Sequence, residues 1–117
     1  MYPYWDVITE PLLTFLQPRI IVEIGSEQGK STQQLLAFCE THDAMLHAID
    51  PFPKFDVVAW QARHGDRFVF HAATSLEALP EIDRYDAVLI DGDDLLEGGL
   101  DTDSLGGGLG LARKSVV

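Results

Sequence analysis

A glycine-containing loop and two acids at strand ends are the residues that could do chemistry in this chain. The loop runs from Gly25 to Gly29 and follows an apolar segment that contains Glu23. Glycines at a strand-to-helix turn let the backbone approach a ligand closely, and the helix N-terminus that follows offers free N–H groups. Asp50 and Asp91 each end a later apolar segment. Carboxylates so placed accept hydrogen bonds from the hydroxyls of a nucleoside, or bind a hard cation.

Four short apolar runs position these residues. They are too short for helices and rich in β-branched or aromatic side chains, so we expect strands. Three of the runs have nearly continuous apolar character, which is typical of parallel strands that are covered on both faces. The predicted strands are Ile20–Ile24, Met45–Ile49, Phe68–His71 and Ala87–Ile90.

Helical patterns precede and separate the strands. The alternation predicts an α/β fold, a Rossmann-like parallel sheet with helices on both faces and an additional N-terminal helix. Cys39, the single cysteine, falls in an apolar helical pattern, which favours a core position over a nucleophile. The four histidines have no metal-ligand spacing and are expected to be structural or on the surface. The predicted helices are Trp5–Leu16, Ser31–Cys39, Val57–Arg63 and Ser75–Leu79.

The glycine loop fits three nucleotide-binding patterns unequally. A dinucleotide fingerprint needs a glycine where Glu27 stands. A P-loop needs one more residue between Gly25 and the Gly29-Lys30-Ser31 segment, although Val88–Asp91 imitates the acid-ended strand of such enzymes. The whole segment matches the third pattern, acid-x-Gly-x-x-x-Gly, from Glu23 to Gly29.

From about Ile20 to Asp94 the chain resembles class I methyltransferases that use S-adenosylmethionine (SAM), in particular small-molecule enzymes with a D-G-D-H-like motif. The resemblance implies SAM and S-adenosylhomocysteine as ligands, a small-molecule methyl acceptor, and strand order 3-2-1-4. Relatives have seven strands, so the chain looks truncated after the fourth.

The resemblance also assigns cofactor-binding roles. Glu23 would lie near the methionine part of SAM, and Asp50 would accept hydrogen bonds from the ribose hydroxyls. Pro51 or Phe52 would pack beside adenine, and Thr74 and Ser75 would lie close to it. Thr74 with Glu77 also forms a capping-box pattern, and for the Thr74 side chain we favour the cap. The loop residues of the cofactor site are Gly25, Ser26 and Gly29.

The end of the fourth strand carries the candidate catalytic residue, Asp91, which would also contact the cofactor. Asp91 and Asp93 are candidate Mg²⁺ ligands, because hard cations prefer carboxylate oxygens. Asp94 stands where relatives often have His, which argues against a histidine base. The remaining metal ligands of such relatives come from a fifth strand that the sequence does not show, so the prediction favours no metal.

Charge and composition exclude several classes of partner. The net charge is −11, from 19 acids against 8 bases, which argues against nucleic acid and anionic membranes as partners. A single cysteine, no visible signal peptide and no apolar run of about 18 residues favour a cytoplasmic location.

The last part of the chain changes character. Residues 1–94 are predicted to form the SAM-binding half-domain, and the Gly- and Leu-rich residues 95–117 a poorly ordered tail. The fourth strand would then have an open edge, through which copies of the chain could associate. The chain would bind SAM but turn over poorly. Two alternatives stay open: a P-loop-like nucleotide-binding protein, and a non-catalytic half-Rossmann interaction module.

Overall fold

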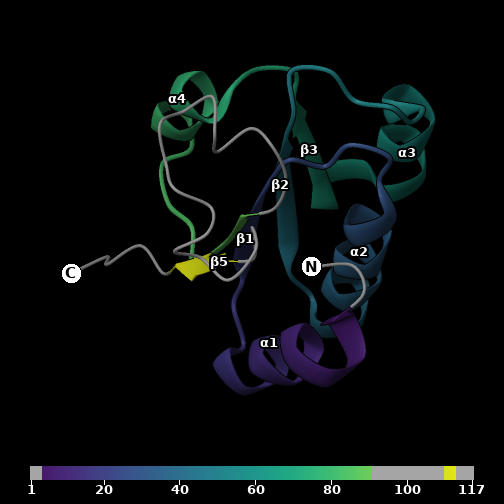
Figure 1. Ribbon diagram of the computed structural model, residues 1–117. Helices are drawn as coiled ribbons and strands as arrows, with labels where there is room; N and C mark the ends of the chain where they lie inside the picture. Colours follow the sequence, from purple (N-terminus) through teal and green to yellow (C-terminus); the bar gives the residue numbers. More distant parts are fainter. Residues whose placement is uncertain (1–3, 91–109, 113–117) are drawn as a thin grey trace.

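The computed structural model describes residues 4–90 and 110–112. Within this part, β-strands and helices alternate after an N-terminal helix, as the sequence predicts (Figure 1). The helical elements are η2 (Trp5–Thr9, a π-helical turn), α1 (Glu10–Leu16), α2 (Lys30–His42), α3 (Val57–His64), η3 (Gly65–Arg67), α4 (Ser75–Ala78) and η4 (Leu79–Glu81). The strands are β1 (Ile20–Ile24), β2 (Met45–Ile49), β3 (Phe68–His71), β4 (Ala87–Ile90) and β5 (Gly110–Ala112).

The sheet has the order β3-β2-β1-β4-β5, and its first four strands are parallel. The predicted order 3-2-1-4 is therefore confirmed. β5 pairs with β4 in the antiparallel direction, with Leu111 opposite Leu89. The glycine-rich sequence before it carries no strand period, so β5 was not predicted.

The pairing of β5 corrects one expectation. Val88, Leu89 and Ile90 of β4 have antiparallel partners, so the edge predicted to be open is occupied along these residues. The predicted boundary at residue 94, and the predicted disorder of the tail apart from β5, lie outside the described residues.

Helices cover the two faces of the sheet, as Figure 1 shows, with α2 and α3 on one side and α4 on the other. Alternate residues of each strand point to opposite faces, and this divides the core into two apolar clusters. The larger cluster joins α2 to the sheet and includes Leu35, Leu36 and Phe68. The smaller joins α4 and η4 to Val22, Ile24, Ile49 and Val88.

Cys39 belongs to the larger cluster, as predicted. Its side chain is fully buried, and this burial raises the pKa of the thiol to about 12, although the nearby Arg67 charge lowers it. The thiol is therefore protonated and inert at neutral pH.

No helix within residues 4–90 is long and apolar enough to cross a membrane.

Candidate functional site

The C-terminal edge of the parallel strands brings the predicted glycine loop and Asp50 together. β1 leads into the loop that begins at Gly25, and β2 leads into the loop that begins at Asp50. The N–H of Gly25 donates to the carbonyl of Ile49 (2.9 Å), and the N–H of Asp50 donates to the carbonyl of His71 (3.1 Å). These two bonds extend the sheet pairing past the strand ends and hold the loops side by side. Ligands of doubly wound folds bind at this edge.

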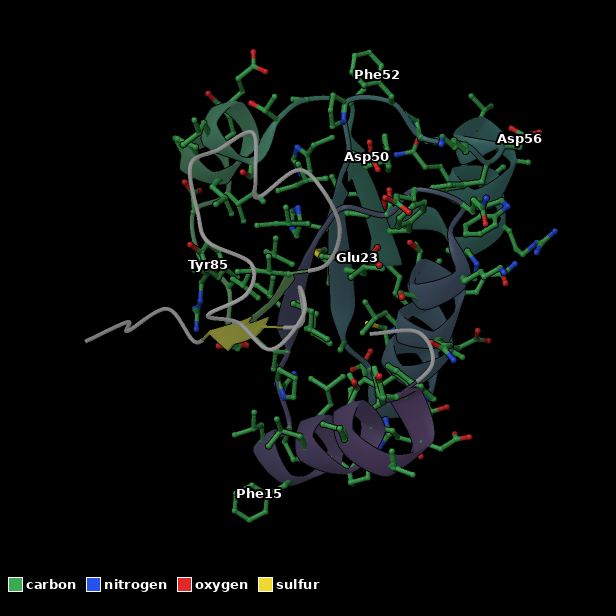
Figure 2. The ribbon with its side chains drawn as sticks, viewed as in Figure 1. Phe15, Glu23, Asp50, Phe52, Asp56 and Tyr85 are labelled. Atoms are coloured by element: carbon green, nitrogen blue, oxygen red, sulfur yellow. The ribbon has the colours of Figure 1, made fainter. Side chains whose placement is uncertain are left out.

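Asp50 joins the two loops through its carboxylate. Its Oδ2 accepts a hydrogen bond from the N–H of Glu27 (2.7 Å), and its Oδ1 accepts one from the N–H of Phe52 (2.8 Å). The residue is only 7 % exposed. Figure 2 shows Asp50 at the strand end with Phe52 beyond it, and the ring of Phe52 points away from the sheet. Each carboxylate oxygen has a second lone pair, so Asp50 can still accept two further hydrogen bonds.

Glu27 is a contributor to this arrangement that the sequence analysis missed. It has a positive φ of 47°, which is uncommon for a residue with a side chain. Its N–H donates to Asp50, and its carbonyl accepts from the N–H of Lys54 (2.8 Å). Hydrogen bonds on both sides of the residue hold this conformation, so the two loops behave as one unit. In the sequence, Glu27 only stands where the dinucleotide fingerprint has a glycine. No pattern in the neighbouring residues indicates its hydrogen bonds with Asp50 and Lys54.

Gly29 ends the loop and starts α2, with φ of 85°. A Cβ built on it would lie 2.6 Å from Cη2 of Trp60 and 3.2 Å from Cδ1 of Phe55. The rings of Phe55 and Trp60 pack together with their centroids 4.3 Å apart. The absence of a side chain at Gly29 therefore makes room for these aromatic residues. The sequence predicts a ligand or the following helix close to Gly29, and in the structure Trp60 of α3 makes that close contact.

Glu23 lies beneath the loop. Its side chain is fully buried, and Oε1 accepts a hydrogen bond from the hydroxyl of Thr32 in the first turn of α2 (2.6 Å). Figure 2 shows Glu23 in the middle of the sheet, below Asp50. This bond links β1 to the first turn of α2 and so fixes the position of the helix N-terminus relative to the strand. Thr32 was not among the predicted site residues.

Removal of the Thr32 hydroxyl should destabilise this part of the fold. Thr32→Val keeps the shape of the side chain but leaves the buried Glu23 carboxyl one donor short. We expect the free energy of unfolding, measured with urea, to fall by about 1–3 kcal/mol, the usual cost of leaving a buried polar group without its hydrogen bond. Thr41→Val is the matched control, because its hydroxyl bonds to the Ala37 carbonyl on the exposed side of α2. Equal losses in the two variants would contradict the role given to Thr32.

Ser26 contributes a buried hydroxyl. The residue is 4 % exposed, and its Oγ has no hydrogen-bond partner among the described residues. Buried polar atoms are nearly always paired in folded proteins, so this hydroxyl is a group that could accept a partner from outside the described residues. Ser26 thus fits the predicted cofactor site.

The segment after β3 forms the predicted helix cap. The Oγ1 of Thr74 accepts from the N–H of Glu77 (3.3 Å), and Oε1 of Glu77 accepts from the N–H of Thr74 (3.2 Å), so the capping box is confirmed. Ser75 is the first residue of α4 and is buried. Because the cap occupies the Thr74 side chain, the backbone N–H groups at the start of α4 are the donors left for a ligand.

His47 and His71 contact each other, which the sequence did not predict. The Nδ1 of His47 lies 3.0 Å from Nε2 of His71, and the ring centroids are 5.2 Å apart at 21°. One ring must donate and the other accept, so the bond cannot form when both rings are protonated. Burial lowers the pKa of both side chains, and the charge of His71 lowers the pKa of His47 further. The prediction that these histidines are structural is in keeping with this bond.

Acid should weaken the fold through this pair. The folded pKa values lie below the ordinary 6.5, so the unfolded chain binds protons more readily, and stability declines as pH falls below about 6.5. His71→Gln should flatten that decline. The measurement is urea unfolding at about pH 7.5 and about pH 5.5, with His64→Gln as the control. The same decline in His71→Gln and the unaltered chain would refute the assignment.

Two of the predicted site residues lie outside the described part of the chain. Asp91 and Asp93, the candidate catalytic and metal-binding acids, are not among the described residues. Within the part of the chain that is described, no three His, Cys, Asp or Glu side chains converge to hold a metal ion.

A separate cleft lies away from the two loops, between the N-terminal helix and α2. It has a volume of about 370 Å³, and none of the predicted site residues lines it. Its lining residues are Trp5, Glu10, Gln33, Gln34, Ala37, Phe38, Thr41 and His42.

Comparison with known proteins identifies a family. A family model described as a methyltransferase domain matches residues 22–98, about two-thirds of the chain, including the glycine loop, Asp50 and the capped start of α4. No curated protein and no solved structure matches the chain.

Proposed function

This chain belongs to the family of methyltransferase domains, and we propose that it binds SAM across the two joined loops, residues 25–29 and 50–54. The observation that carries the proposal is the Asp50 carboxylate, which links both loops while keeping acceptor capacity. The family match favours SAM over the P-loop alternative. The fold supports the proposal as well, because the site stands at the edge where such sheets bind nucleosides.

Asp50 would hold the ribose. Two backbone N–H groups fix the orientation of its carboxylate, and the remaining lone pair on each oxygen suits one of two adjacent ribose hydroxyls. The same N–H groups compensate the buried negative charge before any ligand arrives. Asp50 is therefore preorganised, which lowers the cost of binding.

The neighbouring residues would hold the ends of the cofactor. Phe52 is 78 % exposed and supplies an aromatic surface for adenine, while the N–H groups at Ser75 can donate to the ring. The orphaned Ser26 hydroxyl would bond to a polar atom of the ligand. Glu23, which contacts Thr32, acts as a positioning residue that fixes the loop above it.

Bound SAM would supply an electrophilic methyl group on a sulfonium. What the chain adds is orientation, because alignment of the acceptor with that methyl group provides much of the acceleration in such reactions. A small-molecule acceptor is the substrate class that the D-G-D-H-like motif around Asp91 suggests. Asp91 remains our candidate for the residue near the reacting methyl group.

Calorimetric titration tests the proposal. The chain should bind SAM and S-adenosylhomocysteine and should give no heat with ATP and Mg²⁺. Binding of ATP and Mg²⁺ without a response to SAM would support the P-loop alternative. No response to any of these ligands would support the non-catalytic interaction module, and both outcomes would refute our proposal.

A further inference from the structure

The N-terminal helix has a second apolar face that nothing in the described structure covers. Residues 4–15 divide into rows at four-residue spacing, and each row lies along one side of the helix. In an α-helix, residues four apart are rotated slightly about the helix axis, so a row of them winds around the helix. The wider π-helical turn at Trp5–Thr9 rotates such residues in the opposite sense, so each row stays on one side of the helix. One row is buried (Trp5, Thr9, Leu13), one is polar (Asp6, Glu10, Thr14), and two are apolar and exposed (Tyr4, Ile8, Leu12 and Val7, Pro11, Phe15).

The two exposed rows, called here the outer face, form a continuous apolar surface at the upper end of the size found on monomers. Phe15 is 83 % exposed and Val7 73 %, and Figure 2 shows Phe15 pointing away from the body of the molecule. Tyr4, Ile8 and Leu12 are 51 %, 46 % and 39 % exposed. Together the exposed parts of these residues amount to roughly 600 Å² of mostly apolar surface, the size of the largest such patch on a typical monomer.

We propose that the outer face packs against the same face of a second copy of this chain, around a twofold axis. A specific interface buries about 800 Å² on each partner, so the outer face supplies most of the area that a stable dimer needs. A twofold interface uses one patch twice, which suits a single helix with one exposed apolar face.

Charge favours an antiparallel arrangement of the two helices. Asp6 and Glu10 lie in the polar row toward the N-terminal end of the helix, and the exposed Arg19 follows its C-terminal end. Antiparallel packing brings Asp6 toward Arg19 of the partner subunit, whereas parallel packing brings acids of both copies together. The same acids disfavour an anionic membrane as the occupant of this face.

This surface replaces the sheet edge at β4 as the site of association, because β5 occupies that edge. The proposal does not depend on SAM binding, and its test uses no ligand.

Sedimentation of the full chain at about 1 to about 200 µM tests the dimer. The mass should rise from one copy to two over this range. Phe15→Glu should raise the dissociation constant at least about tenfold, because it puts a charge where an exposed aromatic ring would otherwise be buried against the partner. Val58→Glu is the matched control, because Val58 is 78 % exposed on α3 and gains the same charge. Circular dichroism should show that both variants are folded.

A chain that stays monomeric throughout this range would overturn the proposal. So would a dimer that Phe15→Glu leaves unchanged, which would point to the free edge of β3, or one that Val58→Glu weakens equally. Charge reversal tests the orientation: Arg19→Asp should weaken the dimer, and Arg19→Asp combined with Asp6→Lys should restore it. Failure of that rescue would overturn the antiparallel arrangement.

Discussion

Asp50→Ala is expected to weaken SAM binding by at least about 100-fold, because the ribose hydroxyls lose a charged acceptor worth about 1.5–3 kcal/mol for each hydrogen bond. The same change removes the acceptor for the N–H groups of Glu27 and Phe52. The free energy of unfolding should therefore fall as well, by about 2–4 kcal/mol, while the chain remains folded. Calorimetry with S-adenosylhomocysteine and urea unfolding measure the two effects.

Asp56→Ala is the matched control for this variant. Asp56 caps α3 by accepting from the N–H of Ala59 (3.0 Å), and the residue is exposed. Its loss should cost about 1 kcal/mol of stability and leave SAM affinity unchanged. Asp50→Asn keeps one carbonyl acceptor and should fall between Asp50→Ala and the unaltered chain. Unchanged affinity in Asp50→Ala would refute the ribose assignment.

Gly29→Ala is expected to destabilise the chain by about 2–4 kcal/mol, since two costs add. The positive φ of 85° is unfavourable for alanine, and its Cβ would lie 2.6 Å from the ring of Trp60. Displacement of Trp60 would also disturb the loop, so SAM affinity should drop. Urea unfolding and calorimetry give the two results.

A double-mutant cycle separates the two costs of Gly29→Ala. Trp60→Leu removes the ring atoms closest to the new Cβ, so Gly29→Ala should cost less in that background, where the backbone cost and the 3.2 Å contact with Phe55 remain. If Gly29→Ala costs the same in the Trp60→Leu background as in the unaltered chain, the packing of Trp60 on Gly29 is not what constrains this position.

The sequence was sufficient for the elements and for the edge where the site stands. Each apolar run became a strand at its predicted bounds, and the two central strands, β1 and β4, show the burial on both faces that continuous apolar residues indicate. The capping box at Thr74 and Glu77 was predictable since it depends on residues three apart. The glycine loop was recognisable because positive φ at Gly25 and Gly29 leaves a direct trace in residue type.

What the sequence did not predict are contacts between distant residues. The place of Asp50 at a strand end predicts a ribose acceptor. Only the fold shows that its carboxylate also accepts a hydrogen bond from the N–H of Glu27, 23 positions earlier. The pairing of His47 with His71 depends on the register between β2 and β3, where Ile49 lies opposite His71. β5 was missed because Gly110–Ala112 has no alternation and gains its structure from the edge of β4.

The most direct test of the SAM site is an NMR titration of backbone amides with S-adenosylhomocysteine. The largest chemical-shift changes should fall on the amides of the glycine loop from Gly25 to Gly29, on Phe52 and on Ser75. The amides of Ala37 and Thr41, which line the separate cleft, should not move. Shifts confined to that cleft, or no shifts at saturating ligand, would contradict the proposal that the joined loops bind the cofactor.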